Sequence, residues 1–136
     1  MKGTITVIHF RDSQWNRQTR MFADPGCVYI GRYMARFNLP NSILHNPYKL
    51  DPKNDTPESR RLVLNRYEIY AKDSAPVMSA IADLRRRVDN GEQIKLVCWC
   101  KGTQGEGVDV LCHGDVIQRL VMQYATKTET RQEKLF

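Results

Sequence analysis

The short, mostly apolar run Ile94–Val97, interrupted only by Lys95, constrains the fold of this chain most strongly, because a run of this length indicates a buried strand. We expect the strand to cover residues 94–99. After a polar, glycine-bearing segment, residues 116–124 carry apolar side chains at helical spacing, which predicts a final helix to about residue 125. Thr4–Phe10 is rich in β-branched residues and predicts a first strand, and Cys27–Ile30 predicts a second.

Two helices are expected between the second strand and the third. The first opens with Asp55 or Thr56 as its cap and Pro57 in its first turn, since proline suits the start of a helix. The second runs from about Ala75 to Asp89 and stops at the Asn-Gly pair that follows.

The order strand, strand, two helices, strand, helix favours an α/β fold over a bundle or a barrel. We expect a small three-layer Rossmann-like sandwich with a short, mostly parallel sheet, and a further strand within 14–22 or 33–45. A length of 136 residues favours one domain, residues 1–125, followed by a flexible polar tail at 126–136.

The sequence predicts a cytoplasmic protein. No stretch approaches the roughly 18 apolar residues of a membrane span. The first residues run directly into the first strand and lack the apolar core of a signal peptide. In the cytoplasm the four cysteines would stay reduced, which favours metal binding, catalysis or packing over disulfides.

Positive charge is concentrated in the first third of the chain. The net charge is +6, and residues 1–49 hold seven Lys or Arg against two Asp. Such a bias attracts polyanions or phosphorylated small molecules, although a basic solvated surface explains it equally well. The arginines of this region are Arg11, Arg17, Arg20, Arg32 and Arg36.

Most of the chemically capable side chains lie between residues 98 and 115. Cys98-Trp99-Cys100 ends the third strand, and Cys112-His113-Gly114-Asp115 opens the last helix. In an open α/β sheet, the carboxyl ends of the strands and the helix starts beside them are the usual place for a ligand site.

Three kinds of site fit this cluster. A zinc ion would take Cys98, Cys100, Cys112 and His113, because alternate strand residues share a face. Against zinc, cysteines on strands often serve as small buried hydrophobes. A nucleophilic Cys112 would be favoured as thiolate by the helix dipole, with His113 and Asp115 beside it, but the side chains of sequence neighbours diverge.

The third kind of site is an anion site at the start of the last helix. Free backbone amides and the dipole favour phosphate there, and Gly114 would let a ligand approach the backbone. Asp115 would either cap the helix or hold a ribose hydroxyl or a metal. Arg32, at the end of the second strand, and Arg11 would neutralise the phosphate, while Asn46 would orient the ligand or cap a turn.

Four ordered motifs carry a family resemblance: Tyr29-Ile30-Gly31-Arg32, Asn46-Pro47-Tyr48, Cys98-Trp99-Cys100 and Cys112-His113-Gly114-Asp115-Val116. Over about residues 4–125 the chain resembles a family of small uncharacterised domains common in phage and bacterial genomes. It departs from the family at His45, where glycine is usual, and in a longer segment between Cys100 and Cys112. The resemblance implies a fold and site positions but no reaction.

Two functions therefore stay open. The first is binding, and processing, of a nucleotide or phosphorylated nucleoside at the sheet edge. An enzyme of this kind would be a hydrolase or transferase acting at a glycosidic or phosphate bond. The alternative is a zinc-stabilised, non-enzymatic module that binds nucleic acid or a host protein through its basic N-terminal part.

Overall fold

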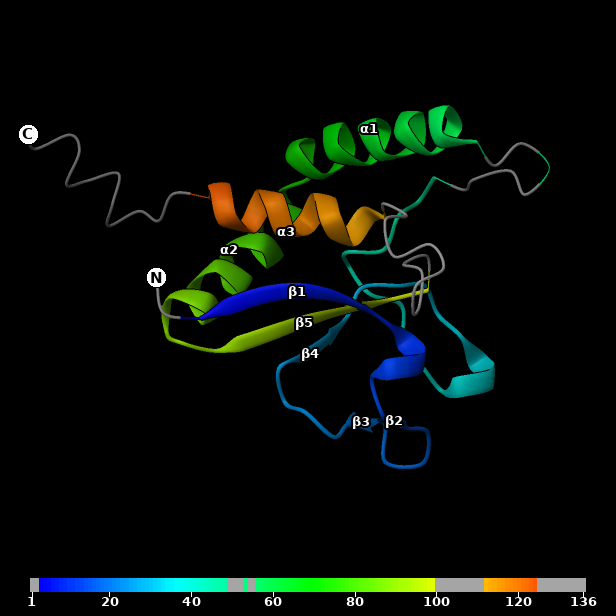
Figure 1. Cartoon of the computed structure of the whole chain (residues 1–136), viewed down its shortest axis with the longest axis vertical. Helices are drawn as coiled ribbons and strands as arrows, with labels where there is room; N and C mark the ends of the chain where they lie inside the picture. Colours follow the sequence, from blue (N-terminus) through cyan, green and yellow to red (C-terminus); the bar gives the residue numbers. More distant parts are fainter. Residues whose placement is uncertain (1–2, 49–52, 54–55, 100–111, 125–136) are drawn as a thin grey trace, which may run out of the picture.

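A three-stranded parallel sheet forms the centre of the molecule (Figure 1). The computed structural model describes residues 3–48, 53, 56–99 and 112–124. The sheet order is β1-β5-β4, and β5 pairs in parallel with both neighbours. The strands are β1 (Thr4–His9), β4 (Cys27–Tyr29) and β5 (Gln93–Cys98). All three predicted strands are confirmed within one residue at each end, as is the mixed α/β class.

Three helices cover one face of this sheet (Figure 1): α1 (Pro57–Asp73), α2 (Ala75–Asp89) and α3 (His113–Gln123). Every second residue of the central strand points towards them. Ile94, Leu96 and Cys98 are fully buried in the core between sheet and helices. The apolar run seen in the sequence is therefore the centre of the hydrophobic core.

The helix boundaries follow from capping groups. The Ser59 amide donates to the Thr56 hydroxyl over 3.1 Å, and the Thr56 amide donates to the Ser59 hydroxyl over 2.9 Å. This reciprocal pair satisfies amides that the first turn of α1 would otherwise leave unpaired. Ser74 ends α1 and begins α2, where its hydroxyl accepts from the Val77 amide.

The opposite face of the sheet is covered without α-helices. An antiparallel hairpin of β2 (Trp15–Asn16) and β3 (Met21–Phe22) lies there with two short 3-10 turns, η1 (Phe10–Asp12) and η2 (Ala35–Phe37) (Figure 1). The further strand expected within 14–22 is thus a separate hairpin, and the 33–45 segment forms only a bridge between Met34 and Leu39. The third layer is irregular because its segments are too short and turn-rich to form helices.

Aromatic rings fill the space between this layer and the sheet. The ring of Phe10 stacks on that of Trp99 with centroids 4.3 Å apart, and Phe37 packs against both, at 5.2 Å and 5.3 Å. The Trp15 indole N–H donates to the Phe37 carbonyl over 2.7 Å. The cluster joins the ends of β1 and β5 to η2, so it positions the carboxyl edge of the sheet. Among the described helices, none has the length and apolar character that crossing a membrane requires.

Candidate functional site

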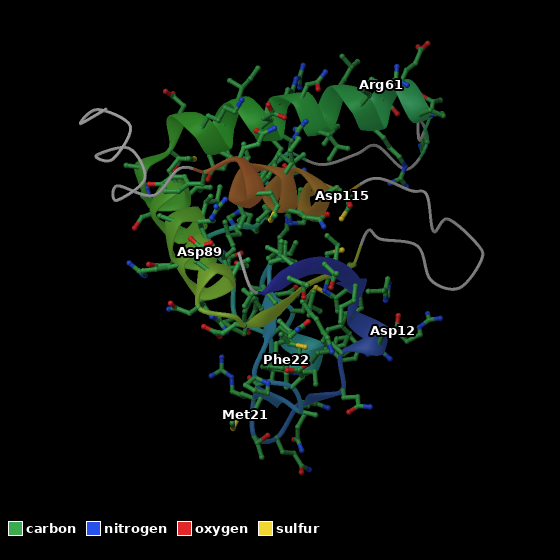
Figure 2. The ribbon with its side chains drawn as sticks, turned by 60° about the vertical axis from the view of Figure 1, so that its left-hand side comes forward. Asp12, Met21, Phe22, Arg61, Asp89 and Asp115 are labelled. Carbon is green, nitrogen blue, oxygen red and sulfur yellow. The ribbon has the colours of Figure 1, made fainter. Side chains whose placement is uncertain are left out.

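The carboxyl ends of all three parallel strands meet the start of α3 at one edge of the molecule. His9, Tyr29 and Cys98 are the last residues of β1, β4 and β5, and His113 is the first of α3. Figure 2 shows Asp115 in the first turn of this helix. The parallel topology therefore brings together segments that lie far apart in the sequence.

The Tyr29 side chain folds back along its own chain at this edge. Its hydroxyl donates to the Arg32 carbonyl over 2.6 Å and accepts from the Trp99 indole N–H over 2.9 Å. Gly31 makes this path possible, because a Cβ there would lie 2.6 Å from Cζ of the Tyr29 ring. The segment from Tyr29 to Arg32 is thus a turn that holds the arginine backbone against the sheet.

The Arg32 side chain reaches the loop that follows. Its Nε and Nη2 donate to the Asn46 carbonyl over 3.2 Å and 2.6 Å. The residue is half-buried, and no carboxylate within the described part of the chain pairs with its guanidinium. Every buried side-chain nitrogen among those residues has a hydrogen-bond partner, so Nη1, which has none there, faces solvent. Arg32 presents an uncompensated, oriented positive charge.

Asn46 contributes its backbone to this arrangement. Its side-chain oxygen accepts from the Tyr48 amide over 2.9 Å and so closes a turn, while its carbonyl holds Arg32. Of the two roles expected for this residue, the structure shows the turn cap, and the role in orienting a ligand stays a prediction.

His113 is buried beneath the same edge. Its Nε2 lies 2.8 Å from the Ile30 carbonyl, which can only accept, so Nε2 carries the proton. Burial lowers the pKa of His113, and the imidazole is therefore neutral, with Nδ1 as its acceptor. The Tyr67 ring packs edge-on against it at 5.3 Å, and the Tyr67 hydroxyl donates to the Leu44 carbonyl over 2.8 Å. Together these contacts join α1 and α3 to the residue that follows β4 and to the loop that contains Leu44.

Cys112 is the cap of α3, and Asp115 completes a capping box. The Asp115 carboxylate accepts from the Cys112 amide over 2.8 Å, and the Gly114 amide donates to the Cys112 sulfur over 3.3 Å. The capping role expected for Asp115 as one alternative is present. The catalytic roles predicted for Cys112, His113 and Asp115 stay predictions, since the partners shown for Asp115 and His113 are backbone groups.

Gly114 lies at the contact between α3 and the sheet. A Cβ at this position would lie 2.7 Å from a methyl group of Val7 and 3.0 Å from Cδ1 of Ile30. The glycine therefore allows close packing of helix on sheet, which is a structural reason for this residue type. Its predicted part in ligand binding stays untested.

Two of the four predicted zinc ligands lie side by side. The sulfurs of Cys98 and Cys112 are 3.4 Å apart, both residues are buried, and the Cys98 thiol lies 3.7 Å from the Ile8 carbonyl. Cys100 lies outside the described residues. Within the described ranges, no three potential ligands gather into a metal site. The zinc set of Cys98, Cys100, Cys112 and His113 thus stays a prediction.

Arg11 lies in η1, directly beyond the end of β1, and its side chain is exposed. Its amide donates to Nδ1 of His9 over 3.0 Å. The sequence interpretation missed Tyr29, Trp99 and Tyr67 as parts of this edge. The sequence shows that Tyr29 and Arg32 lie three residues apart. No local sequence signal indicates that the Tyr29 ring turns back over Gly31.

Comparison with known proteins agrees with the family resemblance at a coarse level. A family model described as "Domain of unknown function" matches residues 12–123, which include β4, β5 and all three helices. No curated protein and no solved structure matches the chain. Since the family model spans most of the sequence, the chain belongs to the family described as Domain of unknown function (DUF4326).

Proposed function

We propose that this protein binds a nucleotide or phosphorylated nucleoside at the carboxyl edge of its parallel sheet, with Arg32 holding the phosphate. The observation that carries the proposal is the state of the Arg32 guanidinium. It is half-buried, directed by the Asn46 carbonyl and without a carboxylate partner in the described ranges. A partly desolvated guanidinium gains most from an anion that can supply the missing charge.

The surroundings of Arg32 suit a phosphate. Burial lowers the pKa of His113 and keeps it neutral, so it adds no charge beside the Arg32 guanidinium. The backbone on both sides is held: Tyr29 binds the Arg32 carbonyl, and the Ser42 amide donates to the Gly31 carbonyl over 3.0 Å. Because the backbone around Arg32 is already held in place, ligand binding costs little further conformational entropy there.

An aromatic ring on which a nucleotide base can stack lies near the phosphate position proposed at Arg32. Tyr48 follows the Asn46 turn, is 36 % exposed, and packs edge-on against Tyr70 with centroids 6.2 Å apart. Aromatic faces bind bases by stacking with little dependence on base identity. This combination favours a nucleotide over free phosphate.

Processing of the ligand is the second part of the proposal. Hydrolysis or transfer at a glycosidic or phosphate bond would call on Cys112, His113 and Asp115 at the start of α3. Cys112 is 2 % exposed and His113 is 7 % exposed, so a ligand on Arg32 would reach them only after a local rearrangement. Binding is therefore the part that the geometry supports more strongly.

The test compares ligand binding by the wild type with that of two arginine variants. Arg32→Ala should stay folded but lose the thermal stabilisation produced by nucleoside monophosphates, measured by differential scanning fluorimetry against its own ligand-free melting temperature and by calorimetric titration. Arg86→Ala is the matched control, because Arg86 is exposed and pairs with Asp83 on α2. Equal binding by all three proteins would reject Arg32 as the phosphate ligand.

A second candidate function, the zinc-stabilised module that binds nucleic acid or a host protein, is favoured by the 3.4 Å approach of the Cys98 and Cys112 sulfurs. Two thiolates at neighbouring positions can share one zinc ion. Metal analysis of purified protein decides between the candidates. One tightly held zinc per chain supports the module, and metal-free protein that nucleotides stabilise supports the ligand site.

A further inference from the structure

Three exposed arginines gather on the irregular layer that lies away from the helices. Arg17 and Arg20 belong to the loop of the β2–β3 hairpin, and Arg36 lies in η2. We call Arg17, Arg20 and Arg36 the arginine lobe. Arg20 Nε donates to the Asn38 carbonyl over 3.3 Å, and the Asn38 side chain donates to the Arg17 carbonyl over 3.1 Å. Hairpin and turn are therefore tied into one surface.

The lobe lacks the charge compensation found on α2 and α3. Each arginine of α2 and α3 pairs with a carboxylate: Arg85 with Asp89, Arg86 with Asp83, Arg87 with Glu92 and Arg119 with Glu68. None of the three lobe arginines has a carboxylate partner in the part of the chain that the structure describes.

Acidic side chains around the lobe are few. Residues 3–48 contain only Asp12 and Asp24, and Asp24 already pairs with Lys95 over 2.7 Å. Figure 2 shows Asp12 on the turn after β1 and Met21 at the hairpin. The lobe thus carries an excess of positive charge that other residues of this layer do not neutralise.

The backbone of the lobe adopts an uncommon conformation at Arg20. Its φ is 57°, in the left-handed region, and Gln14 nearby has a φ of 55°. Glycine takes this conformation without steric cost, whereas an arginine pays for its Cβ. The hairpin therefore carries a cationic side chain at a position where glycine would suit the turn better.

Apolar side chains accompany the arginines. Tyr33 is 65 % exposed and precedes the Met34–Leu39 bridge that closes the turn carrying Arg36, and Met21 on the hairpin is 64 % exposed. Proteins bind single-stranded nucleic acid by neutralising its phosphates and by stacking its bases on aromatic rings. The arginines and the exposed Tyr33 ring supply both kinds of contact. No described helix extends from this layer to enter the groove of a duplex.

We infer that the arginine lobe binds single-stranded nucleic acid, with Arg17, Arg20 and Arg36 on the phosphate backbone and a base stacked on Tyr33. The proposed nucleotide site uses a different arginine, Arg32, whose guanidinium is turned to Asn46. Variants of the three lobe arginines therefore test this inference without removing the phosphate ligand of the other site.

The experiment measures fluorescence anisotropy of labelled single-stranded RNA and DNA of about 16 nucleotides. Arg20→Gly is the central variant, because it removes the charge and relieves the left-handed conformation. It also removes the Arg20 hydrogen bond to the Asn38 carbonyl, while the bond from Asn38 to the Arg17 carbonyl remains. Gln14→Gly is the matched control, since it relieves a similar conformation without changing charge. Combining Arg20→Gly with Arg17→Ala and Arg36→Ala tests the whole lobe, and Arg86→Ala controls for net charge.

Wild-type affinity should fall steeply with salt, and the triple variant should bind at least about tenfold more weakly. The slope of log affinity against log salt should lessen by about 2, at about 0.7 per lost phosphate contact. Gln14→Gly and Arg86→Ala should bind within about twofold of wild type. Equal loss in Arg86→Ala, tighter binding of a duplex of the same length, or binding only to anionic phospholipid vesicles would each overturn the inference. The triple lobe variant should keep the nucleoside monophosphate binding that depends on Arg32, which separates this test from that of the nucleotide site.

Discussion

Replacing Gly31 by alanine tests how the turn before Arg32 is built. The new Cβ would lie 2.6 Å from Cζ and 2.9 Å from Cε1 of Tyr29, so the ring must move. A displaced ring loses two hydrogen bonds, from its hydroxyl to the Arg32 carbonyl and from the Trp99 indole to its hydroxyl.

Two opposing effects decide how much Gly31→Ala changes the free energy of unfolding. Two lost hydrogen bonds cost about 2 kcal/mol of unfolding free energy at about 1 kcal/mol each. Alanine also restricts the unfolded chain and returns about 0.4–1 kcal/mol, because Gly31 does not have a positive φ and the substitution adds no backbone strain. The net prediction is a destabilisation of about 1–1.5 kcal/mol.

Urea denaturation of a double-mutant cycle with Tyr29→Ala gives a sharper result than the single variant. Without the ring there is no clash, so adding Gly31→Ala to Tyr29→Ala should stabilise the protein by about 0.4–1 kcal/mol. The effect of one substitution therefore changes sign between the two backgrounds. Additive effects would show that the Tyr29 ring does not occupy the space beside Gly31.

Two further predictions concern the start of α3. The wild type should lose stability as pH falls from about 7.5 to 5.5, because histidine in the unfolded chain takes up a proton near its ordinary pKa of 6.5 while buried His113 stays neutral. His113→Gln should remove the part of the pH dependence of the unfolding free energy that His113 causes, which is at most about 1.4 kcal/mol per pH unit. Urea denaturation at several pH values measures this dependence. An unchanged pH dependence in the variant would contradict the burial of a neutral His113. Cys112→Ser should cost about 1–2 kcal/mol if the cysteine only packs and caps. Loss of bound metal together with the fold would reveal a metal ligand, and loss of turnover alone would reveal a nucleophile.

Local signals in the sequence were sufficient for most of the secondary structure. Thr56 and Pro57 mark the start of α1, because capping depends only on residues within one turn. Ile94, Leu96 and Val97 marked the central strand, because a strand buried in a parallel sheet is mostly apolar. Lys95 between them is partly exposed and pairs with Asp24. Asp115 could be recognised as a possible cap from its place near a helix start.

Contacts that depend on tertiary packing could not be predicted from local sequence signals. His113 binds the carbonyl of Ile30, 83 residues away, and no sequence spacing encodes that pairing. The ligand role first assigned to the Asn46 side chain competes with a turn that only the folded loop reveals. The layer on the second face was also missed, since residues 10–22 and 33–45 have no helical or strand periodicity long enough to define it.

The most direct test of the central claim is to locate the bound phosphate. In a nuclear magnetic resonance titration of ¹⁵N-labelled protein with a nucleoside monophosphate, we expect the largest shifts at the Arg32 side-chain Nε–H and at the amides of Gly31, Asn46 and Tyr48. Shifts confined to the hairpin or to α1, or an Arg32 Nε–H signal that stays unchanged at saturation, would contradict a phosphate site at this edge of the sheet.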